Sequence, residues 1–182
     1  ATLFGYLADN GDGYGRRYSK GTSSPTYSYY HGGNSGYDNQ NYSNVQKVTT
    51  ATTGNSSTFG SLLSPYVTNF GAGASSGTRS VFAVGSSSYT VVGYNNVIYY
   101  FTNASTGSIS DFGDLSEPRS ALGCCHSSTR GVWAGGRSSA TSYSDAMQYV
   151  TLATTGNTTD FGDLVANANY ISGMSSDNGG LS

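Results

Sequence analysis

The segment Asp-Phe-Gly-Asp occurs twice, at Asp111–Asp114 and at Asp160–Asp163, and carboxylates in this setting hold magnesium in protein kinases. A kinase also needs a glycine-rich phosphate loop with a lysine and a His-Arg-Asp catalytic loop. The sequence has neither of these motifs. Because the segment is repeated without its catalytic companions, we predict that its role is structural.

Residues that bind metal ions are sparse in this sequence. His31 and His126 have no cysteine or carboxylate at a familiar ligand spacing, and the oxygen-rich segment Asp9–Gly13 lacks the spacing and final glutamate of a calcium loop. The adjacent residues Cys124 and Cys125 lie in an expected strand, which favours burial over catalysis. We therefore expect no metal and no cofactor.

The acidic residues do not suggest a hydrolase. A glycosidase needs two carboxylates that flank the scissile bond, and Asp9, Asp12, Asp38 and Glu117 are poor candidates for such a pair. A copper oxidase would need a set of His, Tyr and Cys ligands that two histidines do not provide. We expect no catalytic residues, and a glycan-active enzyme is the least favoured alternative.

Composition excludes further classes of function. The chain has 8 Lys and Arg residues, 10 Asp and Glu residues and a formal net charge of −2, so it lacks the basic surface that binds a phosphate backbone. No stretch approaches the roughly 18 apolar residues of a membrane span. With 16 Tyr and 7 Phe the chain should fold. We expect neither a nucleic-acid partner nor membrane insertion.

One phrase of sequence occurs three times, as ATTGNSSTFGSL from Ala51, ASTGSISDFGDL from Ala104 and ATTGNTTDFGDL from Ala153. The starting positions 51, 104 and 153 are separated by 53 and 49 residues. A partial copy, ATLFGYL, begins at Ala1. A regular period of this length is the mark of a repeat architecture.

Each repeat contains runs that are typical of strands. An apolar run precedes the glycines at 33, 85 and 136, which keep the same period, and a second run such as NVIYYFT is rich in β-branched and aromatic residues. The TGN corner then leads into the strand that contains the Phe-Gly pair. No window shows sustained helical periodicity, so we predict an all-β fold.

Aromatic residues recur at two positions of the repeat, which predicts that they pack between neighbouring units. The predicted core residues are Phe4, Phe59, Phe112 and Phe161 at the first position and Tyr30, Phe82 and Trp133 at the second. Two arginines, Arg79 and Arg130, recur just before the apolar run, and we expect them to bond repeated aspartates across the units.

Units of this size resemble kelch repeats, which carry a di-glycine after an apolar strand, two later aromatics and often an arginine after a proline. Gly135–Gly136, Tyr149, Phe161 and Pro118–Arg119 fit that order. The phrases TTGNTTDFGDL and SSDNGGL also resemble a family of kelch-like proteins of tailed phages. The resemblance implies a β-propeller and a virion-associated protein that is structural or contacts the host.

We predict a single kelch-like β-repeat domain over residues 1–182, with a partial unit at 1–33 and units at 34–85, 86–136 and 137–182. About three and a half units are few for a propeller, which closes with about four to eight blades. A small closed ring, a ring completed by oligomerisation and a piece of a longer protein are all consistent with this number. Bare strand edges would attract other chains, so we favour a homo-oligomer.

The loops after the glycines vary in sequence but are rich in Tyr, Ser, Gly and Asn, a composition typical of recognition surfaces. They suggest a non-enzymatic adhesin on the virion surface, outside the cell, that binds host-surface glycans or proteins. A purely architectural protein that holds other virion proteins is the alternative. The candidate ligand contacts are Tyr37, Tyr42, Tyr89, Tyr94 and Tyr143.

Overall fold

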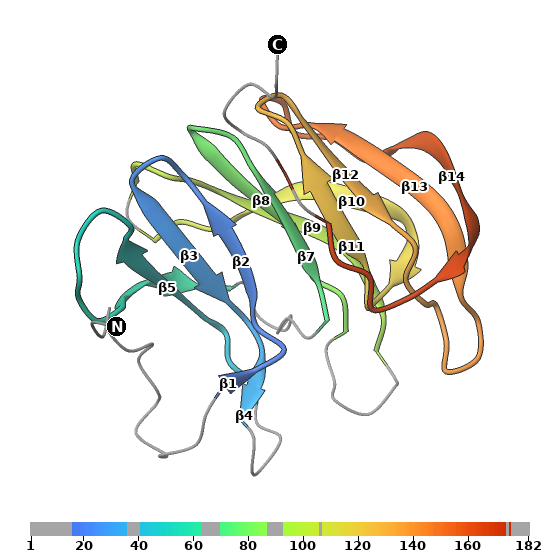
Figure 1. Cartoon of the computed structure of the whole chain (residues 1–182), viewed down its shortest axis with the longest axis horizontal. Coiled ribbons are helices and arrows are strands. Elements are labelled where there is room, and N and C mark those ends of the chain that lie inside the picture. The colour runs from blue at the N-terminus through green and yellow to red at the C-terminus, as the bar shows by residue number, and fades with distance from the viewer. Residues whose placement is uncertain are drawn as a thin grey trace.

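The computed structural model of the chain describes residues 16–35, 41–62, 70–86, 93–105, 107–173 and 175 (Figure 1). Every regular element among them is a β-strand, which confirms the all-β prediction. The described residues include no apolar helix of membrane-spanning length. Phe4 lies outside the described residues.

The strands form three four-stranded antiparallel sheets and one two-stranded sheet. Each large sheet is built from four consecutive strands, apart from the short β4, and we number these sheets 1 to 3 along the chain. Sheet 1 contains β2 (Lys20–Ser23), β3 (Tyr27–His31), β5 (Asn44–Thr49) and β6 (Ser57–Ser61); sheet 2 contains β7 (Ala72–Ser75), β8 (Arg79–Ala83), β9 (Asn95–Thr102) and β10 (Ser110–Arg119); sheet 3 contains β11 (Gly123–His126), β12 (Arg130–Ala134), β13 (Ser144–Thr151) and β14 (Thr159–Ala168); the small sheet pairs β1 (Arg16–Arg17) with β4 (Asn34–Ser35).

The three large sheets lie side by side like the leaves of a fan, with β2, β7 and β11 as their first strands (Figure 1). The unit boundaries that we expected after Gly33, Gly85 and Gly136 fall inside the sheets, between the second and third strands. The repeat period is therefore that of the sheets, but each structural unit begins at its first strand. In the described part of the chain no strand of sheet 1 pairs with a strand of sheet 3, and the three sheets do not form a closed ring.

The Phe-Gly pair of the repeated phrase forms a β-bulge in each sheet. Phe59, Phe112 and Phe161 are the residues skipped when the last strand pairs with the third. A bulge of this kind bends the strand and changes the direction of the side chain at the extra residue. The recurring phrase therefore encodes a bend in the outer strand.

The glycine after each phenylalanine allows the next sheet to approach. A Cβ atom on Gly60 would lie 2.5 Å from the carbonyl oxygen of Gly107, and one on Gly113 would lie 2.4 Å from that of Gly156. Gly107 and Gly156 belong to the Thr-Gly corner of the following sheet. Any side chain at these glycines would push the sheets apart, so the repeated phrase supplies both partners of one joint.

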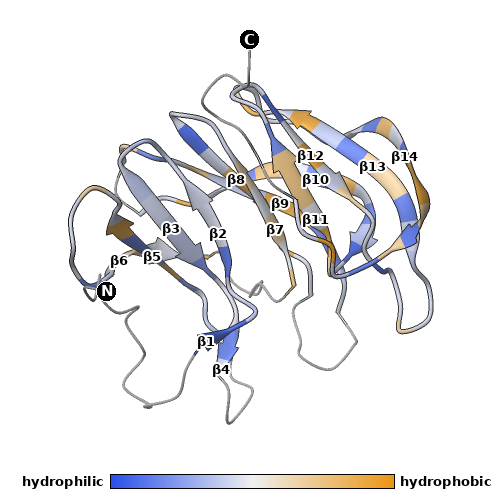
Figure 2. Cartoon of the chain, in the orientation of Figure 1, coloured by the Kyte–Doolittle hydropathy of each residue, from blue (hydrophilic) through white to orange (hydrophobic). Residues whose placement is uncertain are grey.

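Two hydrophobic clusters fill the spaces between the sheets. Phe82 of β8 and Val84 just after this strand belong to the cluster shared with sheet 1, whereas Val81 and Ala83 of β8 belong to the cluster shared with sheet 3. Strand alternation thus buries both faces of sheet 2. Figure 2 shows the apolar residues concentrated where the sheets adjoin.

Burial of the predicted core aromatics depends on whether a neighbouring sheet covers them. Phe59 and Phe112 are 7% and 2% exposed and lie against the following sheet. Phe161, which we expected in the core, is 47% exposed, because no described sheet follows sheet 3. The prediction for Phe161 was therefore wrong.

Burial at the second aromatic position depends on the preceding sheet, whereas burial at the first position depends on the following sheet. Phe82 stacks on His31 of sheet 1 at 4.2 Å between ring centroids, and the indole N–H of Trp133 donates to the carbonyl of Ala72 of sheet 2 at 3.0 Å. Tyr30 occupies the same register position in sheet 1, where no described sheet precedes it, and is only half-buried. The buried aromatic of β3 is instead Tyr29, whose hydroxyl donates to the carbonyl of Asn103 of sheet 2 at 2.7 Å.

The repeated arginines bond carbonyls and aromatic rings rather than aspartates. Arg79 donates to the carbonyl of Leu152 in sheet 3 at 3.1 Å and lies 4.5 Å from the ring centroid of Tyr100. Arg130 lies 4.4 Å from that of Tyr149. The expectation of bonds to aspartates was wrong. The guanidinium of Arg79 lies against a carbonyl and a tyrosine ring, and that of Arg130 lies against a tyrosine ring.

Arg119 joins sheet 2 to sheet 3. Its side chain is buried, pairs with Glu117 and donates to the carbonyls of Gly135 and Ala146 at 3.4 and 3.2 Å. Both carbonyls belong to sheet 3, so the guanidinium bridges the two sheets. Planar guanidinium geometry suits this use of several acceptors.

The different surroundings of Phe112 and Phe161 predict unequal effects on stability. We expect Phe112→Ala to lower the free energy of unfolding by about 3–5 kcal/mol, the usual cost of emptying a buried aromatic site. We expect the matched change Phe161→Ala to alter it by no more than about 0.5 kcal/mol. Urea unfolding followed by tryptophan fluorescence measures both, and equal losses would contradict the packing described above.

His31 is a buried imidazole at the joint of sheets 1 and 2. It is 0% exposed, and neither ring nitrogen has a hydrogen-bond partner among the described residues. Burial, together with the nearby charges of Lys20 and Arg16, lowers the pKa of His31 to about 3. The imidazole is therefore neutral in the folded protein at ordinary pH.

This lowered pKa predicts that acid destabilises the fold. Between pH about 6.5 and 3 the unfolded chain binds a proton at His31 that the folded chain does not. The free energy of unfolding should fall there by up to about 1.4 kcal/mol per pH unit from this residue. His31→Phe should give a shallower decline in urea unfolding at pH 7, 5 and 4, and identical pH dependence in the two proteins would refute the prediction.

Candidate functional site

The loops between the second and third strands of each sheet start and end in the same backbone geometry. Each follows a glycine with a positive φ angle: 88° at Gly33, 80° at Gly85 and 92° at Gly136. Such angles favour glycine and turn the chain sharply. The carbonyl of each glycine accepts a hydrogen bond from an amide at the end of its loop. The donors are the amides of Tyr42, Asn95 and Ser144, at donor–acceptor distances of 2.9, 2.9 and 3.0 Å.

Two of the five tyrosines that we predicted as ligand contacts occupy equivalent positions at the ends of these loops. Tyr94 forms an isolated antiparallel β-bridge with Ser86, and Tyr143 forms one with Arg137. Tyr143 is 45% exposed, whereas Tyr94 is half-buried and its hydroxyl has no hydrogen-bond partner among the described residues. Tyr143 therefore offers the most accessible ring of the described candidates.

Tyr42 is not a surface contact, contrary to our prediction. It is 4% exposed, and the guanidinium of Arg16 lies 4.5 Å from its ring centroid. The residue equivalent to Tyr94 and Tyr143 is Asn41, which forms an isolated antiparallel β-bridge with Asn34. Tyr42 is one residue further along the chain, and a shift of one residue turns a strand side chain to the other face. Tyr37 and Tyr89 lie outside the described residues.

The loop before Tyr143 is held by its own hydrogen bonds. The hydroxyl of Ser139 accepts the amides of Thr141 at 3.3 Å and Ser142 at 3.0 Å. The hydroxyl of Tyr143 donates to the carbonyl of Ala140 at 3.4 Å. These bonds fix the ring before any ligand arrives, which lowers the entropy cost of binding.

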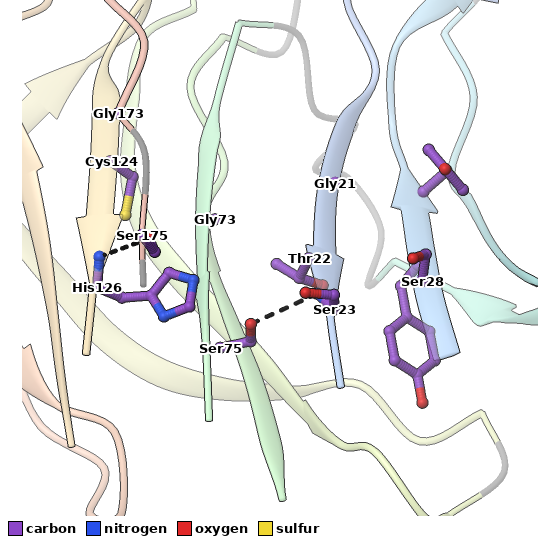
Figure 3. A pocket seen from close by; sticks show the side chains of 12 residues that line it. Gly21, Thr22, Ser23, Ser28, Gly73, Ser75, Cys124, His126, Gly173 and Ser175 are labelled. Carbon is purple, nitrogen blue, oxygen red and sulfur yellow. Dashed lines mark hydrogen bonds between the residues drawn. The ribbon is translucent and has the colours of Figure 1, made fainter. Parts of the chain in front are cut away.

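A second candidate site is a groove of about 340 Å³ across the first strands of the sheets. β2, β3, β7 and β11 contribute to it, together with Gly173 and Ser175, and Figure 3 shows side chains around the opening. We call it the inner-strand groove. It is lined by Gly21, Thr22, Ser23, Ser28, Tyr29, Tyr30, Gly73, Ser75, Cys124, His126, Gly173 and Ser175.

Two equivalent hydrogen bonds connect the strands beside this groove. The amide of Ser23 donates to the hydroxyl of Ser75 at 3.4 Å, and the amide of His126 donates to the hydroxyl of Ser175 at 2.9 Å (Figure 3). Ser23, Ser75 and His126 share one register position in the three sheets. Ile171, Gly173 and Ser175 thus lie against β11 much as β7 lies against β2.

The chemistry of the inner-strand groove is polar and uncharged. Hydroxyls, one imidazole and backbone groups line it, and none of its lining residues is Asp, Glu, Lys or Arg. Burial is the main cause that raises the pKa of the Cys124 thiol, and the neighbouring Cys125 adds to it. The Cys124 sulfur is therefore not a ready nucleophile. The arrangement suits recognition by hydrogen bonding.

Sequence reasoning missed this groove, although a signal was present. The patterns GTSS, GASS and GMSS begin at Gly21, Gly73 and Gly173, and CCHS takes their place at Cys124. This small-residue pattern is weaker than the aromatic and glycine patterns of the repeat, because serine and glycine are common throughout the chain. Among the described residues no three His, Cys, Asp or Glu side chains are grouped as metal ligands.

Comparison of the sequence with known protein-family models and with curated protein sequences finds no match. The architecture itself defines the chain as an all-β repeat protein of four-stranded antiparallel sheets. Its candidate sites are therefore interpreted from their geometry.

Proposed function

We propose that the three sheets are kelch-like propeller blades of a non-enzymatic protein on the surface of a phage particle. In this proposal the loops after Gly33, Gly85 and Gly136 contact glycans of the host surface. One observation carries the proposal: three loops of different sequence are mounted on the same backbone frame. A constant frame with variable loops is typical of recognition proteins.

Tyr143 is the residue on which this proposal depends most. Its exposed ring is held by the Ser139 loop, and aromatic faces pack well against sugar rings. The hydroxyl bonds only within its own loop, so we assign recognition to the ring and not to the hydroxyl.

A glycan array probed with labelled protein tests this assignment. We expect Tyr143→Ala to weaken binding roughly two- to tenfold, because loss of an aromatic contact costs roughly 0.5–1.5 kcal/mol. Tyr143→Phe keeps the ring and should bind like the wild type. Absence of glycan binding by the wild-type protein, or equal binding by all three proteins, would count against a glycan ligand at the loops.

A specific observation favours a second function, attachment to other virion proteins or to further copies of the chain. Phe161 on β14 is 47% exposed at the outer face of sheet 3, and Leu164, the equivalent of the buried Leu115 of sheet 2, is only half-buried. The equivalent face of sheet 2 is covered by sheet 3. In this alternative the outer face of sheet 3 is covered by another protein in the particle or in a homo-oligomer.

Co-sedimentation with particles and analytical ultracentrifugation of the isolated protein distinguish the two functions. We expect Phe161→Glu to reduce association by about tenfold or more if the face is an interface, since a carboxylate would be buried without a partner. Ser128→Glu adds the same charge on an exposed turn and is the matched control. Association that is indifferent to Phe161→Glu would remove this second function.

A further inference from the structure

The inner-strand groove contains hydroxyls that the fold itself does not use. Within the described part of the chain no hydrogen bond involves the hydroxyls of Ser23 and Ser28. The hydroxyl of Thr22 and Nδ1 of His126 are buried and likewise have no partner among the described residues. Buried polar atoms normally find partners, so this concentration beside one groove indicates that a ligand or water completes them.

Tyr30 gives the groove an aromatic wall. The ring is half-buried on β3, and it makes no contact with another aromatic ring in the described part of the chain. The equivalent residues Phe82 and Trp133 are covered by the preceding sheet. Tyr30 is therefore free to present a ring face, which is the feature that packs against the C–H surface of a sugar.

The glycines of the groove have a separate explanation, and the inference does not rest on them. A Cβ atom on Gly73 would lie 2.5 Å from Cγ2 of Thr22, and one on Gly173 would lie 1.8 Å from the carbonyl oxygen of Cys124. These residues are glycine because the strands approach closely. The hydroxyls of Ser23 and Ser28 form no hydrogen bond in the described part of the chain, so they are available for recognition.

Charge and size restrict the class of ligand. None of the lining residues is Asp, Glu, Lys or Arg, so an ionic group would be desolvated without an ion-pair partner. A purely apolar ligand would leave the hydroxyls unsatisfied. The volume of about 340 Å³ lies at the small end of the range of about 300–1,000 Å³ for small-molecule pockets.

We propose that the inner-strand groove binds a neutral monosaccharide ring. The sugar stacks on Tyr30 at one end, and its hydroxyls bond Ser23, Ser28 and His126. The site is distinct from the loop surface around Tyr143 and does not depend on it. It would let the protein hold the end of a host glycan, or a free sugar, in addition to any contact by the loops.

Titration with neutral monosaccharides, followed by NMR, tests this proposal on the full chain. Glucose, galactose, mannose and N-acetylglucosamine are the probes, with glucuronate and glucose 6-phosphate as charged counterparts. The chain has only 2 histidines, so their imidazole signals are easily assigned. We expect at least one neutral sugar to shift the His126 signals saturably while those of the buried His31 stay in place, and the charged sugars to bind at least tenfold more weakly.

Variants separate this site from the loops. We expect Tyr30→Ala to weaken sugar binding about tenfold and Tyr30→Phe to preserve it, whereas Tyr143→Ala should leave the His126 shifts unchanged. His126→Leu provides a second test on another strand and should also weaken binding. The proposal is overturned if no neutral sugar shifts His126, if folded Tyr30→Ala and His126→Leu proteins bind like the wild type, or if only Tyr143→Ala abolishes binding.

Discussion

The structure depends on the close joint between one sheet and the next. At this joint the glycine of a Phe-Gly bulge meets the Thr-Gly corner of the following sheet, and the amide of Gly156 donates to the carbonyl of Phe112 at 2.7 Å. The bulge aims the phenylalanine into the same space. A single phrase of sequence therefore supplies the bend, the contact and the apolar side chain, which explains why it is repeated.

The same joint sets the electrostatic properties of the interior. Where sheet 2 packs on sheet 1 the space is filled by aromatic rings, and His31 is enclosed among them without a partner for either nitrogen in the described part of the chain. Its lowered pKa follows from that enclosure. Arginines near the joints are tolerated because they reach carbonyls and ring faces, as Arg79 does with Leu152 and Tyr100.

Sequence patterns predicted the strands and the period, because both are local properties of the repeated phrases. They failed where the outcome depends on a neighbour or on a single register step. Phe112 and Phe161 stand in identical phrases, yet only Phe112 has a sheet beyond it. Tyr42 differs from Tyr94 and Tyr143 by one position in the loop and is therefore turned inward. The inner-strand groove arises only when five separate segments meet, so no single stretch of sequence encodes it.

Each repeat separates the residues that pack the sheets together from the residues of the proposed binding loops. The residues that form the joints lie in the strands of the sheets and in the Thr-Gly corner, whereas the loops after Gly33, Gly85 and Gly136 connect the second strand of each sheet to the third. Substitutions in the loops leave the joints intact, because the loop ends are fixed by backbone bonds that any residue can make. The first strands carry a third set of small residues, of which some let neighbouring sheets approach closely and others line the inner-strand groove. A repeat of this design can change what it binds without changing how it folds.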